Sequence, residues 1–213
     1  MGTRHLICVF YNGRFVIAQF GWWDGYPEGQ GLNLLKFLRV PTKIQRLKDG
    51  LEHIYEASRA EIMTAKTQIN RLRGLEKEIW EDYAANPMSK FTSELMDRYH
   101  PSLHGDTGAA ILEIVSRAKA EKKVPIAFDL HFANNGLYCE FAYVVNLDTE
   151  ILEVFHGAKK KTPNHRFRDV GEENESVPIF TSSFTFSELQ RIKSEKQFLT
   201  QVNKDIVSVL ILV

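Results

Sequence analysis

The stretch RHLICVFYNGRFVIAQF (residues 4–20) decides the fold, because it places two apolar runs on either side of an Asn-Gly pair at positions 12–13. Asn-Gly tolerates positive φ at both central positions of a tight turn and is the strongest short signal for a β-hairpin. A two-residue loop would pair Val9 with Val16 and would place Ala18 on the same face of the hairpin as Val9. Both faces are apolar at the hairpin centre, which predicts that the sheet containing it is covered on both sides.

The rest of the chain alternates helical and strand-like segments. Apolar spacing of three and four predicts helices, at residues 32–40, 42–85 (one long helix or two in line), 89–99, 108–120 and 187–203. Alternating or continuous apolar runs predict strands, at residues 124–131, 137–145, 150–156, 177–180 and 206–213. The polar segment 157–176 is predicted to be a mobile loop. This order predicts one domain over residues 1–213 of the α/β (α+β) class, with mainly antiparallel sheets and helices packed on them.

Composition and charge exclude several classes of partner. Lysine plus arginine and aspartate plus glutamate number 27 each, so the overall charge offers nothing to attract nucleic acid or an anionic membrane. No apolar run reaches the ~20 residues of a membrane-spanning helix, and the start of the sequence lacks the pattern of a signal peptide. Cys8 and Cys139 lie in apolar strand-like runs and are predicted to be buried thiols in a reducing compartment. We therefore expect a cytoplasmic protein.

Residues 21–31 (GWWDGYPEGQG) form the segment that most favours a functional site. Four glycines and a proline argue against a regular element, and glycines let a ligand approach the backbone closely. Trp22 and Trp23 adjoin Asp24, so the indole rings are predicted either to desolvate this carboxylate or to form a stacking surface for a ligand. Other side chains of the loop that are predicted to contact a ligand are Tyr26, Glu28 and Gln30. The alternative is an Ω-loop whose tryptophans plug the end of the sheet and whose polar groups bond its own backbone.

Two further groups of polar residues are candidates for chemistry. His104 and Asp106 precede a predicted helix, where free N–H groups suit an anion, although simple capping of that helix by Asp106 and Thr107 is the commoner explanation of such a pattern. Asp129 and His131 share one face of a predicted strand, where an acid orients a histidine or the two form a core hydrogen bond. The histidines and cysteines show no HxH, HExxH or CxxC pattern, so neither a metal nor another cofactor is predicted.

The opening MGTR (residues 1–4), the hairpin that follows and the loop motif WDGYPEGQG (residues 23–31) resemble a family of uncharacterised microbial proteins. The likeness extends to residues 106–108 and 139–145 and so covers most of the chain. This family has no assigned activity. The resemblance therefore implies kinship without implying a reaction.

The order of elements is also similar to that of the N-terminal-nucleophile hydrolases, which build a four-layer αββα sandwich. This likeness implies that sandwich as one form of the fold, and an apolar two-sided hairpin suits a layered core. The chain departs from those enzymes at its start, because removal of Met1 leaves Gly2, which has no nucleophile. Thr3 would become terminal only after a second cleavage.

Two functions follow from these residues, and both stay open. The first is an enzyme that acts on an amide or acyl bond, with Thr3 as nucleophile or Asp24 as general base and with Arg4 binding a carboxylate. The second is a non-catalytic module whose tryptophan-rich loop binds a small ligand or a partner protein. The expected partner is thus a small molecule or a peptide, and neither nucleic acid nor a membrane.

Overall fold

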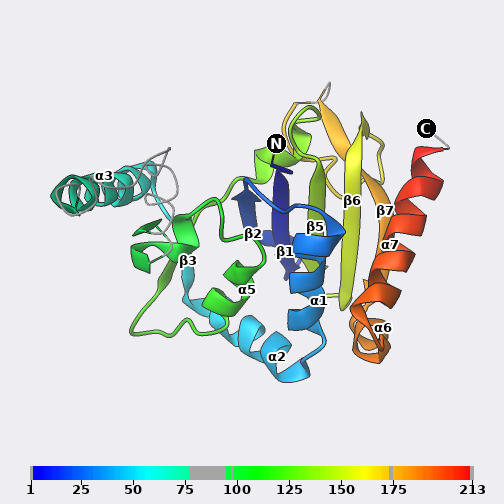
Figure 1. The fold of residues 1–213 in the computed structure, drawn as a ribbon, viewed down its shortest axis with the longest axis horizontal. Helices are drawn as coiled ribbons and strands as arrows, with labels where there is room; N and C mark the ends of the chain where they lie inside the picture. Colours follow the sequence, from blue (N-terminus) through cyan, green and yellow to red (C-terminus); the bar gives the residue numbers. More distant parts are fainter. Residues whose placement is uncertain (1, 77–94, 97, 173–174, 212–213) are drawn as a thin grey trace.

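A mixed five-stranded β-sheet forms the centre of the computed structural model, which describes residues 2–76, 95–96, 98–172 and 175–211 (Figure 1). The strands lie in the order β2-β1-β5-β6-β7. Their bounds are β1 His5–Tyr11, β2 Arg14–Gly21, β5 Phe141–Asn146, β6 Ile151–Lys160 and β7 Ser176–Thr185. The β1–β5 pair is parallel, and the neighbouring pairs are antiparallel. The predicted α+β class with a mainly antiparallel sheet is therefore confirmed.

The predicted N-terminal hairpin is present, but its register differs from the prediction. Both turn residues at positions 12–13 have positive φ, as an Asn-Gly turn requires. A β-bulge pairs Val9 with Ile17, so the predicted Val9–Val16 pair is wrong. Because a shift of one residue moves side chains to the other face, Ala18 packs on the face opposite Val9 instead of beside it.

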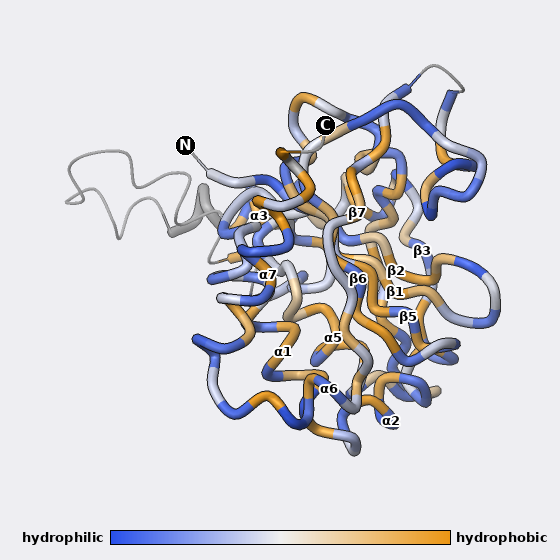
Figure 2. Tube along the Cα trace, turned by 90° about the vertical axis from the view of Figure 1, so that its right-hand side faces the viewer, coloured by the Kyte–Doolittle hydropathy of each residue, from blue (hydrophilic) through white to orange (hydrophobic). Residues whose placement is uncertain are grey.

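Both faces of the sheet are covered, as the apolar hairpin predicted. One face packs against helices α1 (Leu32–Leu38), α5 (Ala110–Val115), α6 (Phe186–Arg191) and α7 (Glu195–Leu210). The other face is covered by a 3-10 helix, Leu130–Asn134, and by segment 161–172, which places Phe167 and Val170 in a second apolar cluster. Figure 1 shows α1 and α7 along the sheet, and Figure 2 shows that the hydrophobic segments concentrate along the strands.

Cys8 and Cys139 are buried free thiols, as predicted, and both belong to the cluster on this second face. Burial raises the pKa of the Cys139 thiol to about 12, and it raises the pKa of Cys8 well above the ordinary value. Since the thiolate is the reactive form of cysteine, neither sulfur is suited to act as a nucleophile near neutral pH.

A second, two-stranded sheet adjoins the edge of the first. It pairs β3 (Ile54–Glu56) with β4 (Val124–Ile126) in parallel. The chain that leaves β4 runs beside β2, where Ala18 forms a bridge with Phe128 and accepts the N–H of Asp129 at 2.8 Å. The small sheet thus extends the large one sideways. A four-layer αββα sandwich would instead stack two sheets face to face, and the described residues do not form it.

The single or in-line helix predicted over residues 42–85 is interrupted by β3. Helix α2 (Pro41–Gly50) begins at the proline, which suits the first helical position because the N–H there has no helical partner. A Cβ at Gly50 would lie 1.9 Å from the carbonyl oxygen of Val115, so this glycine permits a close approach of α5. A 3-10 turn (Leu51–His53) and β3 follow before α3 (Arg59–Glu76) resumes the helical pattern.

Three other helices differ from their predicted bounds. Residues 32–40 contain α1, and residues 108–120 contain the shorter α5. The predicted helix 187–203 corresponds to α6, which begins one residue earlier, and to the start of α7. Thr185, not the predicted Ser187, caps α6, and Ser194 caps α7 by accepting the N–H of Gln197. A second capping serine therefore divides the predicted helix in two. The predicted stop at residues 86–87 and most of the predicted helix 89–99 lie outside the described residues.

The predicted strand over residues 124–131 ends at Ile126, because the chain turns into the 3-10 helix that begins at Leu130. Asp129 and His131 consequently do not share a strand face, and the predicted pairing of their side chains on such a face is wrong. Both residues are exposed. The following strand also starts later than predicted, since β5 begins at residue 141 instead of 137.

The apolar C-terminal run 206–213, predicted as a buried strand, continues helix α7 as far as Leu210. Phe198, Val202 and Ile206 are buried and recur every four residues, which is the spacing of one face of a helix. Val207, the next residue, is exposed. The run therefore completes an amphipathic helix. The predicted strand is wrong because it rested on the apolar composition of the run alone.

Segment 157–176 is more regular than the predicted mobile loop. Residues 157–160 belong to β6, where Lys159 pairs with Val177 and Lys160 with Ser176. Farther along, the side chain of Phe167 is fully buried. The segment thus packs against the sheet over its described part, residues 157–172 and 175–176.

Candidate functional site

Loop 21–31 is fixed to the start of the sheet. The N–H of Gly25 donates to the carbonyl of Thr3 at 3.0 Å, and the hydroxyl of Tyr143 donates to the carbonyl of Gly25 at 2.8 Å. The last five residues form a single π-helical turn, Pro27–Gly31, that leads into α1, where the sequence predicted no regular element. The loop is therefore tied to the segment that leads into β1 and to strand β5.

Asp24 adopts a left-handed backbone conformation, with φ of 58°. Its carbonyl accepts the N–H of Gln30 at 2.9 Å, which closes the loop, and a Cβ at Gly29 would lie 2.3 Å from the same oxygen. Glycine at position 29 therefore permits the closure. The side chain of Asp24 is exposed, so the predicted desolvation of this carboxylate by the indole rings is not found.

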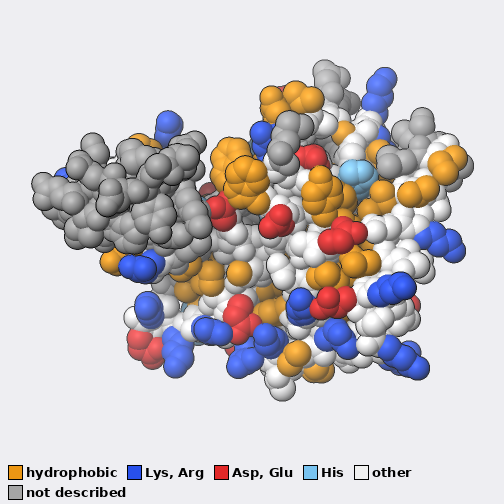
Figure 3. All heavy atoms as spheres, in the orientation of Figure 1, with side chains coloured by type: hydrophobic (Ala, Val, Ile, Leu, Met, Phe, Trp, Pro, Cys, Tyr) orange, Lys and Arg blue, Asp and Glu red, His pale blue; other side chains and the backbone are white. Residues whose placement is uncertain are grey.

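The side chains of the loop form an exposed aromatic and acidic surface. Trp22, Trp23 and Tyr26 are 50%, 55% and 50% exposed. Asp24 and Glu28 are exposed as well. The Nδ2 of Asn203 on α7 donates a hydrogen bond to one carboxylate oxygen of Glu28 at 3.0 Å. We call these residues, Trp22, Trp23, Asp24, Tyr26 and Glu28, the tryptophan patch. Figure 3 shows hydrophobic and acidic side chains interspersed on this side of the molecule.

Two glycines support the indole rings of the patch. A Cβ at Gly2 would lie 2.0 Å from Cε3 of Trp23, and a Cβ at Gly105 would lie 2.5 Å from Cδ1 of Trp22. The N–H of Trp22 also donates to the carbonyl of Gly105 at 3.0 Å. Each ring thus rests directly on backbone, which restricts its rotamers while leaving half of its surface open.

Arg4, predicted to bind a carboxylate of a substrate, has aromatic neighbours within the chain. Its guanidinium carbon lies 4.6 Å from the ring centroid of Tyr138 and 5.9 Å from that of Trp22. Its backbone N–H donates to Oε1 of Glu140 at 3.1 Å. The chain therefore already uses the face of one patch ring to hold a cation.

His5, the first residue of β1, is a site residue that the sequence analysis missed. It is 1% exposed, and its ring lies against Gly21, where a Cβ would be 2.1 Å from Cε1. Neither ring nitrogen has a hydrogen-bond partner among the residues that the structure describes. Burial lowers the pKa of His5 to about 4, although the Thr3 carbonyl and the carboxylates of Asp24 and Asp106 act in the opposite direction. His5 is consequently a neutral imidazole at pH 7.

Thr3 and Gln19 complete a buried polar cluster with His5. Thr3 is 2% and Gln19 1% exposed, and both Oγ1 of Thr3 and Oε1 of Gln19 lack partners in the described part of the chain. The Nε2 of Gln19 donates to the carbonyl of His104 at 3.0 Å. Buried polar atoms are normally bonded, so such a concentration needs an explanation. The burial also keeps the Thr3 hydroxyl out of reach of a substrate in this conformation.

The segment 104–109 contributes polar groups beneath the patch. Nε2 of His104 lies 3.6 Å from Oδ2 of Asp106, and their interaction is an ion pair only when the histidine is protonated. Helix α5 begins without a side-chain cap, so the predicted capping by Asp106 or Thr107 is not observed. The N–H of Ala109 donates to Oε1 of Gln30 at 2.8 Å. The side chain of Gln30 is thus buried and has a structural role. It accepts an N–H of the segment that was predicted to bind an anion.

A cavity of about 480 Å³ opens beside Trp22, between β2 and helix α3. This volume falls in the range of small-ligand sites. Its walls combine apolar side chains with polar groups, among them Gln19, Lys66, His104 and Asp129. The structure therefore brings Trp22 and His104 to one cavity, whereas Trp23, Asp24, Tyr26 and Glu28 face solvent outside it.

Comparison of the chain with protein-family models, with curated proteins and with solved structures finds no match. The resemblances to the microbial family and to the N-terminal-nucleophile hydrolases therefore stay predictions. In the parts of the chain that the structure describes, no group of three or more His, Cys, Asp or Glu side chains is placed to hold a metal. Among the same residues, no helix combines the length and apolarity needed to cross a bilayer.

Proposed function

We propose that this protein is a binding module that recognises a cationic group of a small molecule or peptide through the tryptophan patch. The observation that carries the proposal is the exposure of Trp22, Trp23 and Tyr26 beside the exposed carboxylate of Asp24 on an anchored loop. Aromatic faces attract cations through their quadrupole, and a neighbouring carboxylate adds charge attraction. The contact of Arg4 with Trp22 is an internal example of the same recognition.

The anchoring of the loop supports binding because it reduces the entropy lost when a ligand is bound. The carbonyl of Asp24 and the N–H and carbonyl of Gly25 are already bonded within the chain. The indole rings rest on Gly2 and Gly105. A surface held in this way needs little reorganisation, which favours affinity.

A second candidate, an enzyme acting on an amide or acyl bond, is favoured by the buried polar cluster. His5 is neutral at pH 7, the form in which an imidazole accepts a proton, although a pKa of about 4 makes it a weaker general base than an ordinary histidine. This candidate requires the loop to open, because Thr3 and His5 are both buried. Intact mass separates the two: a mature chain that begins at Thr3 supports the enzyme, and one that begins at Met1 or Gly2 supports the binding module.

The test of cation recognition uses tetramethylammonium, with neutral tert-butanol as the matched probe that has the same bulk and no charge. We expect tetramethylammonium, and not tert-butanol, to shift the indole Nε1–H resonances of Trp22 and Trp23. Trp23→Ala and Asp24→Asn should each weaken binding at least about fivefold, since each removes one attractive group. Tyr55→Ala, which removes an exposed aromatic ring on β3 away from the patch, is the control. Equal shifts by both probes, or unchanged binding in the two patch variants, would overturn the proposal.

A further inference from the structure

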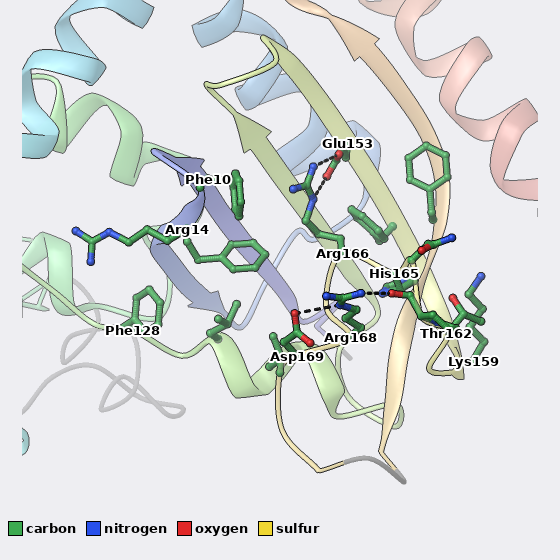
Figure 4. Close-up of a pocket in the computed structure, with 18 residues that line it drawn as sticks. Phe10, Arg14, Phe128, Glu153, Lys159, Thr162, His165, Arg166, Arg168 and Asp169 are labelled. Carbon is green, nitrogen blue, oxygen red and sulfur yellow. Dashed lines mark hydrogen bonds and ion pairs between the residues drawn. The ribbon is translucent and has the colours of Figure 1, made fainter.

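A second cavity lies on the face of the sheet opposite α1 and α7, away from the tryptophan patch (Figure 4). Its volume is about 1010 Å³, and it is bounded by the ends of β1 and β2, by β6 and by the segment 162–170. No residue of the tryptophan patch lines it. Any ligand of this cavity is therefore independent of the proposed cation site.

Phenylalanine rings form the apolar wall of this cavity. The five that line it are Phe10, Phe15, Phe128, Phe155 and Phe180. Phe155 and Phe180 meet edge to face at 5.6 Å between centroids, and Phe180 is 43% exposed. An open ring above a buried one offers a flat ligand a surface on which to stack.

The charged residues of the lining carry a positive excess, because four are basic and two are acidic. Arg166 is already bound by both carboxylate oxygens of Glu153, and Arg168 lies 3.1 Å from a carboxylate oxygen of Asp169. Arg14 and Lys159 have no ion pair among the described residues. These two cations lie at opposite ends of the cavity in Figure 4.

His165 supplies a hydrogen-bond donor at the Lys159 end. Its Nδ1 accepts the N–H of Phe167 at 3.1 Å, so the hydrogen of the neutral ring is on Nε2. That Nε2 is buried and has no hydrogen-bond partner at an ordinary distance and angle among the described residues, and His165 as a residue is 9% exposed. Burial, assisted by the charge of Lys159, lowers the pKa of His165, against the opposite effect of the Pro178 carbonyl. The ring is therefore neutral at pH 7 and carries one N–H.

Thr162 lies in the same turn as His165, whose N–H donates to the Thr162 carbonyl at 3.0 Å. Both side chains line the cavity together with Lys159. A hydroxyl, an imidazole N–H and an ammonium group form a donor set, which suits an acceptor with several oxygens and negative charge. Phosphate fits this set, and its charge of about −2 near neutral pH complements the excess of two basic residues.

We propose that this cavity binds an aromatic phosphate, with the phosphate at Lys159, Thr162 and His165 and the ring against Phe155 and Phe180. The two subsites are adjacent, because the rings of Phe155 and His165 lie 5.8 Å apart between centroids. A nucleoside monophosphate belongs to this chemical class, and so does a simple aryl phosphate. Segment 157–176, whose basic residues had no predicted role, thus contributes the groups that bind the phosphate.

Phenyl phosphate and AMP are the probes for this proposal, and calorimetric titration is the measurement. Inorganic phosphate carries the anion without a ring, and adenosine carries a ring without the anion. We expect both aromatic phosphates to bind at least about tenfold more tightly than either half-probe, because stacking and charged hydrogen bonds each contribute roughly that factor or more. Equal binding of inorganic phosphate and phenyl phosphate would overturn the role of the ring.

Variants at the two ends of the cavity locate the phosphate. Lys159→Gln should weaken phenyl phosphate binding about tenfold because it removes the positive charge, and His165→Phe should do the same because it removes the imidazole N–H. Arg14→Gln removes the same charge from the same cavity at its other end and should change the affinity less than about twofold, since no direct hydrogen bond is lost. Circular dichroism of each variant checks the fold. An equal loss in Arg14→Gln and Lys159→Gln would show non-specific attraction and would overturn the placement.

Discussion

The imidazole of His5 lies against Gly21, its partner across the β1–β2 ladder, in space that any other residue at position 21 would occupy. A Cβ there would be 2.1 Å from Cε1 of His5. We expect Gly21→Ala to lower the free energy of unfolding by about 1–3 kcal/mol, because a buried ring must move to admit the methyl group. Urea denaturation followed by circular dichroism measures the change.

Gly31→Ala is the control for that substitution. Gly31 has helical dihedrals, and the nearest atom to its Cβ would be 3.4 Å away, so a methyl group fits without movement. We expect a change of less than about 0.5 kcal/mol, or a small gain in stability. Similar losses in the two alanine variants would contradict the close packing of His5 on Gly21.

The lowered pKa of His5 predicts that stability falls with acidification. The unfolded imidazole takes up a proton below its ordinary pKa of 6.5, whereas the folded ring resists protonation until about pH 4. The contribution is therefore complete above pH 6.5 and is lost as the pH falls toward 4, by ~3 kcal/mol in all. Urea denaturation across this interval measures the slope. His5→Gln, which does not titrate, should show a flatter profile, and identical profiles would refute the assignment to His5.

Asp24→Asn separates a ligand-binding role from a structural one. Asparagine tolerates the left-handed conformation of position 24 well, and the carbonyl bond to the Gln30 N–H does not depend on the side chain. The midpoint of thermal unfolding should therefore stay within about 2 °C of that of the unaltered protein, since a surface change of this kind is worth under about 0.5 kcal/mol. A large loss of stability would identify Asp24 as a structural residue and would remove the functional interpretation.

Helix α3 offers a matched pair of substitutions on its two faces. Ile69 is 1% exposed in a cluster with Leu95 and Met96, whereas Met63 is 54% exposed. Ile69→Asp should cost about 3–5 kcal/mol, because it buries a charge without a partner, and Met63→Asp should cost less than about 1 kcal/mol. Chemical denaturation of the two variants gives the comparison. A small effect at position 69 would show that α3 does not pack as described.

The ion pair of Arg166 with Glu153 joins the segment 161–172 to β6 through two hydrogen bonds. Glu153 is buried, and its oxygens accept both Nε and Nη2 of Arg166. Arg166→Met should destabilise the protein by about 3–5 kcal/mol, because the carboxylate is left buried and unpaired. Adding Glu153→Gln to that variant should recover part of the loss, as measured by differential scanning calorimetry. An Arg166→Met variant as stable as the unaltered protein would contradict a structural role for the pair.

The hairpins and the two-sided core were predictable because their signals are local. An Asn-Gly pair between apolar runs needs no information from the rest of the chain. The bulge was not predictable, since the same turn is compatible with the regular register that pairs Val9 with Val16. Strand β3 was missed for a related reason. Ile54 continues the apolar spacing of α2, and its pairing with Val124 overrides the local helical pattern.

The candidate site was predictable in its exposed part and not in its buried part. Tryptophans and carboxylates in a glycine-rich loop are visible in the sequence, and the structure places them on the surface. His5 looked like an ordinary strand residue, because its importance depends on the bulge that sets it opposite Gly21 and not Phe20. The burial of Phe167 holds the segment that carries His165 against the sheet, near Lys159. The polar residues around Phe167 gave no sign of this packing in the sequence.

The parallel pairing of β1 with β5 has a consequence for how the chain folds. His5 pairs with Phe141, 136 residues later, so the two central strands come from distant parts of the sequence. The hairpins β1–β2 and β5–β6 each close locally, but their encounter requires a long loop to close first, and contacts of this kind slow folding. During synthesis, the edge of β1 that pairs with β5 stays unpaired until most of the chain has left the ribosome. We therefore expect slow refolding, and we expect a chaperone to assist the nascent chain until β5 has been synthesised.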